Sequence, residues 1–197
     1  MDFNKPKVLG LDVSTKTIGW ALFDWQSEEL LELTHFSPRV KPEPEDKIEL
    51  LIEKANAFAK KLEEIKNFGI LKVIVEEPLL TSNNIYTVGT LLRYNSMIVK
   101  TVHDVLGVTP HFISTYNSRK FAFPNLFKEN KSGKKVLFGG YPKGCDKKKI
   151  IWENVSELEP KVEWLYTRNE TLKKECFDMA DAYTCVKGFM RKEGIWG

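Results

Sequence analysis

The sequence has few cysteines and no long hydrophobic run. Its three cysteines, Cys145, Cys176 and Cys185, are an odd count without C-x-x-C spacing. This pattern argues against a disulfide framework and a structural zinc site, and it favours a reducing compartment. No run is long enough to span a bilayer, and the N-terminus has no apolar signal core. We therefore expect a cytoplasmic, intracellular protein without a membrane partner.

Extremes of composition and charge are also missing. The 197 residues contain no internal repeat, and the formal net charge is only +3, so the positions of the charges matter more than their sum. The length predicts a single domain over residues 1–197. Lysines and glycines concentrate at about 125–149, which we interpret as a basic loop that contacts nucleic-acid phosphates. A solvated, weakly ordered surface loop is the alternative.

The first apolar run, residues 7–11, ends in the carboxylate of Asp12. A polar turn and a second apolar run at residues 18–24 follow, which predicts a β-hairpin whose first strand lies inside a sheet. An acid at the end of a buried strand loses hydration and needs a partner such as a metal ion or a hydroxyl. Hydrogen bonds to turn amides around Ser14 and Thr15 are the alternative explanation.

The rest of the chain predicts an α/β fold. Strands are expected at 30–36, 70–78 and 108–114, and helices at about 45–68, 88–106, 146–157 and 175–192. The alternation of strand and helix after the hairpin predicts parallel strands beside it. The expected architecture is a mixed sheet, with an antiparallel three-stranded start and then parallel strands, flanked by helices. The 88–106 helix carries more apolar surface than one core contact requires, which favours a homodimer.

Carboxylates recur at three special places. Besides Asp12, the expected strand 70–78 carries Glu76 near its end, and Asp178 and Asp181 share one face of the last helix. Acids near the start of a helix also interact favourably with the helix dipole, and this purely structural role is the alternative. No lysine or histidine stands within three residues of any of the four acids, so the set favours hard divalent cations held by oxygen ligands. Two such ions would support phosphodiester hydrolysis.

Neighbouring residues of a strand point to opposite faces, so only one of Glu76 and Glu77 can readily face Asp12. Glu76 is the first polar residue after the buried run Val73–Val75. We therefore expect Glu76, and not Glu77, to lie with the other carboxylates.

The chain resembles the RuvC-type Holliday-junction resolvases of the RNase H-like nuclease superfamily, and phage and viral members more closely than bacterial ones. The resemblance is carried by Gly10-Leu11-Asp12, Thr17-Ile18-Gly19, Val73-Ile74-Val75-Glu76 and Asp178-Met179-Ala180-Asp181-Ala182. It implies that Asp12, Glu76, Asp178 and Asp181 bind two Mg²⁺ ions, for which Mn²⁺ substitutes. It also implies a homodimer that cuts four-way junction DNA by paired symmetric nicks. A phage or viral source is left open.

The resemblance also concerns contacts to DNA. The polar, basic stretch Ser114–Lys120 resembles the family segment that approaches DNA phosphates. Bacterial members usually have Pro-Gly after the first Asp, where this chain has Val13-Ser14. They also carry an aromatic residue at the position that Leu79 occupies here. Tyr86 is the candidate that could replace this aromatic residue. The candidate DNA contacts are Ser14, Tyr86, Arg93, Asn117, Arg119, Lys120, Lys147 and Lys148.

Three other functions fit parts of the pattern. An RNase H-like nuclease that acts on other branched DNA, in debranching, packaging or repair, is not separated from a strict resolvase by sequence. An actin-like ATPase or sugar kinase has a similar first strand, but such enzymes use two copies of the fold, and 197 residues allow one. A non-catalytic DNA-binding relative is disfavoured, because carboxylates that face DNA without metals weaken binding.

Overall fold

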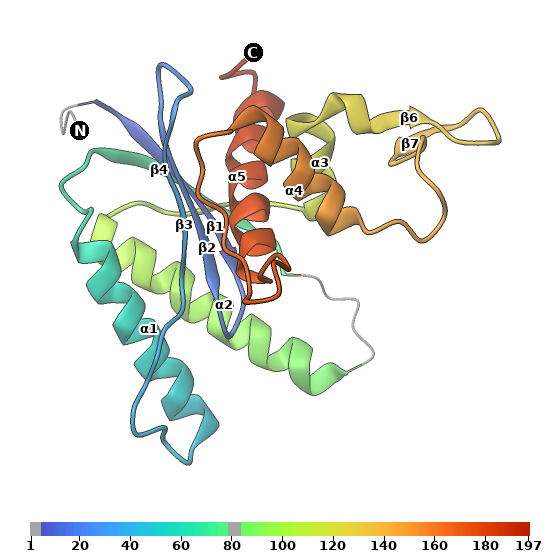
Figure 1. Ribbon diagram of the computed structural model, residues 1–197. Helices are drawn as coiled ribbons and strands as arrows, with labels where there is room; N and C mark the ends of the chain where they lie inside the picture. Colours follow the sequence, from blue (N-terminus) through green and yellow to red (C-terminus); the bar gives the residue numbers. More distant parts are fainter. Residues whose placement is uncertain (1–4, 79–83) are drawn as a thin grey trace.

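The structure is a computed structural model that describes residues 5–78 and 84–197. Within these ranges, five strands form a mixed sheet in the order β3-β2-β1-β4-β5 (Figure 1). β1 (Lys7–Val13), β2 (Ile18–Asp24) and β3 (Leu30–Phe36) are antiparallel neighbours. β4 (Ile70–Glu76) and β5 (His111–Ile113) add in parallel beside β1. The expected mixed sheet, with an antiparallel start followed by parallel strands, is confirmed.

Helices cover both faces of the sheet (Figure 1). α1 (Lys47–Glu63) and α2 (Ile85–Leu106) pack on one face, over side chains that include Leu9 and Val73. α3 (Thr115–Ala122), α4 (Lys147–Leu158) and α5 (Glu175–Lys192) lie on the other, with Val8 and Ile74. Because strand side chains alternate between faces, Asp12 and Glu76 fall on the α5 side of the sheet.

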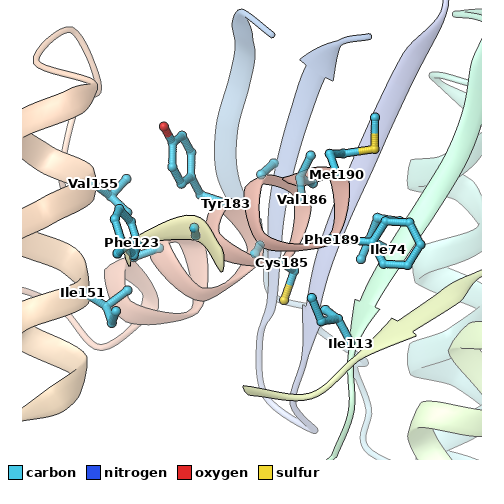
Figure 2. Close-up of a cluster of buried hydrophobic side chains, with 14 of the residues drawn as sticks. Ile74, Ile113, Phe123, Ile151, Val155, Tyr183, Cys185, Val186, Phe189 and Met190 are labelled. Atoms are coloured by element: carbon cyan, nitrogen blue, oxygen red, sulfur yellow. The ribbon is translucent and has the colours of Figure 1, made fainter. Parts of the chain in front are cut away.

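α5 forms the centre of the hydrophobic core on the face of the sheet that α3, α4 and α5 cover. Figure 2 shows Val186, Phe189 and Met190 of this helix near Ile74 and the sheet strands. On its other side, Tyr183 faces the helix α4, which buries Ile151 and Val155 (Figure 2). α5 is therefore held between the sheet and α4, and the position of its acids is fixed from both sides.

The segment expected as a basic loop contains regular structure. A short 3₁₀ helix, η1 (Pro124–Leu126), leads to an antiparallel hairpin of β6 (Phe127–Glu129) and β7 (Lys135–Leu137). The hairpin projects away from the sheet at the right of Figure 1. Its turn is closed by the Asn130 side chain, which accepts from the N–H groups of Ser132 and Lys134, and by Gly133 at φ 75°.

Several element ends differ from expectation because local caps decide them. α1 ends at Glu63 rather than near residue 68, and Gly69 instead adopts a left-handed φ of 72° just before β4. α2 starts at Ile85 rather than 88, because the Asn84 side chain accepts from two N–H groups of its first turn. β5 covers only three residues of the expected 108–114. Among the described residues, no helix combines the length and the apolar character needed to cross a membrane.

Candidate metal centre and nucleic-acid interface

Three carboxylates meet at the end of the sheet. Asp12 near the end of β1, Glu76 at the end of β4 and Asp181 of α5 each place a carboxylate oxygen within 4.8 Å of the other two. Asp12 and Glu76 are half-buried and Asp181 is 4% exposed. A compact set of hard oxygen donors at this spacing fits a divalent cation such as Mg²⁺ or Mn²⁺.

Asp178 lies at the edge of this group rather than inside it. It lines the same cleft, whose volume is about 180 Å³, but its oxygens do not belong to the three-carboxylate set. Glu77 is exposed at this cleft, and its backbone N–H donates to the carbonyl oxygen of Ile113. The structure therefore gives Glu76 and Glu77 different surroundings, with Glu76 inside the cluster and Glu77 towards solvent.

Two glycines allow α5 to approach the sheet closely. A Cβ atom on Gly10 would lie 2.4 Å from the carbonyl oxygen of Ala182, and one on Gly19 would lie 2.0 Å from that of Asp178. Both distances are below any tolerated contact, so side chains at these positions would push α5 away. The Gly-Leu-Asp and Thr-Ile-Gly motifs thus set the distance between Asp12 and the α5 acids.

Two cations compensate the carboxylates. Arg119 of α3 is buried, and its Nη2 donates to Asp181 Oδ1 across 3.0 Å. Lys148 of α4 approaches the other oxygen, with Nζ 3.2 Å from Asp181 Oδ2 and 3.8 Å from Asp178 Oδ1. Sequence reasoning found no basic residue near the acids, because these two lie 62 and 33 positions before Asp181 along the chain.

A signal for the position of Lys148 was nevertheless present. Lys148, Ile151 and Val155 are spaced three and four residues apart, so they share one face of α4. Ile151 and Val155 are the buried residues of that face, and they pack towards α5. A lysine in line with a buried apolar stripe, rather than opposite it, points towards the neighbouring element.

The carboxylates repel one another in this setting. Burial, followed by the charges of Glu76 and Asp181, raises the pKa of Asp12 well above its ordinary range. Burial and the Asp181 charge raise the pKa of Glu76 to about 7. Burial raises the pKa of Asp178 to about 6, although Lys148 opposes this. Groups that resist ionisation together are the groups that a bound cation would stabilise.

The candidate DNA contacts lie in different environments. Tyr86, in the first turn of α2, is 84% exposed and lines a hollow with Ser14 and Leu91, both of which also line the acidic cleft. Ser14 accepts from the N–H of Thr17 and donates to its carbonyl, which closes the hairpin turn.

The other candidates fall into two groups. Arg93 and Lys147 are exposed, and Asn117 and Lys120 are half-buried. Arg119 is buried and Lys148 is exposed, and both are ion-pair partners of the acids. Leu79, at the position of the bacterial aromatic residue, lies outside the described residues.

Three solved structures of RuvC and of a Holliday junction resolvase resemble the fold. RuvC of Thermus thermophilus has 16% identity and a TM-score of 0.55, over 95% of this chain and 96% of its own. The same RuvC in complex with a Holliday junction substrate has 13% identity and a TM-score of 0.60, over 96% of each chain. The yeast mitochondrial Holliday junction resolvase Ydc2 has 15% identity and a TM-score of 0.58, over 95% of this chain and 79% of its own.

No protein-family model and no curated protein sequence matches the chain. The structural likeness nevertheless extends over nearly all of it. The chain has the RNase H-like fold of RuvC-type resolvases, as the sequence resemblance implied.

Proposed function

We propose that the protein is a metal-dependent endonuclease that resolves four-way DNA junctions by paired, symmetric nicks. One observation carries the proposal: the carboxylates of Asp12, Glu76 and Asp181 converge within 4.8 Å at the strand ends of a RuvC-type fold. Sites of open α/β sheets gather at such strand ends. The pKa values of Asp12 and Glu76 are also raised, as is common at functional sites.

The chain's own residues have separable roles in this proposal. Asp12, Glu76 and Asp181 would hold Mg²⁺, with Mn²⁺ as a substitute, and Asp178 would act from the cleft edge. Bound there, a divalent cation supplies Lewis acidity towards the scissile phosphate and lowers the pKa of a coordinated water. Arg119 keeps Asp181 directed into the cleft, because its guanidinium binds the carboxylate from the α3 side.

Exposed basic side chains of the β6-β7 hairpin and of α4 support DNA as the substrate. Exposed lysines follow the hairpin β6-β7 and the start of α4: Lys128, Lys131, Lys134, Lys135, Lys143, Lys147 and Lys149. Such charges bind phosphates of any sequence and orient the duplex. Tyr86 offers a large exposed ring beside the cleft, suited to stacking on an unpaired base at a branch point.

Paired nicks in opposing strands need two active centres related by symmetry, so the proposal includes a homodimer. It also places the protein where branched DNA occurs, inside the cell.

A cleavage assay tests the proposal. Four-way, three-way, flap and linear duplex DNAs are offered at equal concentration with Mg²⁺, and Asp12→Asn and Asp178→Asn serve as inactive controls that should still bind the junction. Preferred cutting of the four-way junction in opposing strands supports the proposal. Equal cutting of the three-way and flap DNAs would favour a general branched-DNA nuclease instead, and cutting that persists in chelator would overturn the metal dependence.

A further inference from the structure

The Lys148 ammonium group lies between two carboxylates of the acidic cleft. It lies 3.2 Å from Asp181 Oδ2 and 3.8 Å from Asp178 Oδ1, between the two acids that share one face of α5. A lysine side chain is ordinarily protonated at physiological pH, so its ammonium group is a positive charge between these two acids.

The fold directs this one lysine into the cluster and its neighbours elsewhere. Lys147 places its Nζ over the Phe138 ring, 5.9 Å from the centroid. Lys149 lies 3.9 Å from Glu153 one turn along the same helix. Cations in the first turn of a helix are disfavoured by the helix dipole, so Lys148 gains its stabilisation from the α5 carboxylates.

One divalent cation would neutralise the net charge of the side chains in the cleft. Asp12, Glu76, Asp178 and Asp181 supply four negative charges when ionised. Arg119 and Lys148 supply two positive charges in direct contact with them, which leaves two negative charges. Glu77, at the cleft, is exposed, so solvent and salt screen its contribution.

The positions of the groups agree with this balance. The three oxygens within 4.8 Å belong to Asp12, Glu76 and Asp181, so they define one compact cation site. The remaining carboxylate, Asp178, is the one beside Lys148 and outside that set. A second divalent cation between Asp178 and Asp181 would lie against the ammonium group.

We infer that Lys148 takes the place of a second divalent cation, so that this centre binds one divalent ion and uses the ammonium group as its other positive charge. The inference rests on the proposed metal-dependent nuclease and refines it, since the sequence resemblance implied two Mg²⁺ ions. Removal of the lysine charge should open the second site between Asp178 and Asp181.

Counting bound Mn²⁺ on the full chain, without DNA, by electron paramagnetic resonance tests the inference. We expect one ion on the wild type and two on Lys148→Met, with second-ion binding at least about tenfold tighter than on the wild type. Lys149→Met is the matched control, because it removes the same charge from the same helix turn and should leave one ion. Lys148→Arg keeps the charge and should also bind one.

Two ions on the wild type, or one ion on Lys148→Met, would overturn the inference. Thermal unfolding in chelator shows whether Lys148→Met folds. If it does not, Lys148→Gln removes the same charge with a polar side chain, and the bound Mn²⁺ ions are counted on that variant. The outcome is independent of the proposed activity. A wild type that binds one ion but cuts no branched DNA contradicts the proposed function alone, whereas one that binds two ions and resolves junctions contradicts the inference alone.

Discussion

Arg119 Nη2 donates to Asp181 Oδ1 across 3.0 Å, and this ion pair joins α3 to α5 beside the acidic cluster. The two side chains are 10% and 4% exposed. Loss of one partner leaves the other charge buried without its compensation. Arg119, which the sequence suggested as a DNA contact, therefore has a structural partner inside the protein.

Arg119→Met should lower the free energy of unfolding by about 3 kcal/mol, at the low end of the range for a broken buried pair because Lys148 still neutralises Asp181. Denaturant unfolding in chelator measures this. The control is Lys120→Met, which should change stability by less than about 0.5 kcal/mol. It should instead reduce the slope of log binding constant against log salt by about one unit. The interpretation is wrong if Arg119→Met keeps full stability and flattens the salt slope.

The stability of the metal-free protein should depend on pH through Glu76 and Asp178. Their pKa values are about 7 and about 6 in the folded protein, above the ordinary 4.5 and 3.8. A carboxyl group whose pKa is higher in the folded than in the unfolded protein stabilises the fold at pH values below its unfolded pKa. This stabilisation is lost as the pH rises from the unfolded pKa through the folded pKa. In chelator, the contribution of these two groups is therefore lost between about pH 4 and about pH 7.

Comparison of the wild type with Glu76→Gln isolates this effect. His111, whose pKa is lowered mainly by burial, acts in the opposite direction but equally in both proteins. We expect Glu76→Gln to raise the melting temperature at neutral pH in chelator by several degrees, since about 1 kcal/mol corresponds to roughly 2–4 °C at this size. Glu77→Gln, at an exposed position, should leave the melting temperature unchanged. A melting temperature for Glu76→Gln below that of the wild type would contradict the assignment.

Tyr86 should contribute to junction binding by stacking. Its ring is exposed beside the cleft, and loss of a base–aromatic contact costs roughly 1–3 kcal/mol. Tyr86→Ala should therefore weaken binding to a four-way junction by about tenfold or more, while binding to linear duplex stays unchanged. Fluorescence anisotropy with both DNAs measures this, and Tyr86→Phe should retain the affinity. An equal loss on linear duplex would show a contact that does not depend on the branch.

A homodimer should form through the outer face of α2. Ile98 and Val102, part of the apolar surface that suggested a dimer, are buried in the protein's own core. Leu92 of α2 and Phe112 of β5 stay exposed, at 39% and 43%. Light scattering should return twice the chain mass, and Leu92→Glu should return the monomer mass because it places a charge in the contact. A wild type with the monomer mass at micromolar concentration would exclude this dimer.

The mixed sheet could be predicted from the alternation of strand and helix along the chain, and the meeting of Asp12 with Glu76 from the alternation of side chains along each strand. Val8, Gly10 and Asp12 share one face of β1, and Ile74 and Glu76 share the matching face of β4, so the two carboxylates meet once the strands are parallel. The hairpin β6-β7 was missed, because its signal is the Asn130 turn and not a hydrophobic period. The partners Arg119 and Lys148 were missed for a different reason. Their approach to Asp181 depends on how α3 and α4 pack on α5, and the spacing within α4 indicates only that Lys148 points towards a neighbouring element.

Single-turnover cleavage of one four-way junction by the wild type, Glu76→Gln and Glu77→Gln tests the central claim most directly. The structure places Glu76 with Asp12 and Asp181, whereas Glu77 is exposed. We expect the wild type to nick opposing strands, Glu76→Gln to be slower by several orders of magnitude, and Glu77→Gln to be slower by roughly tenfold or less. A wild type that leaves the junction intact, or a Glu76→Gln variant that cuts as fast as the wild type, would contradict the account.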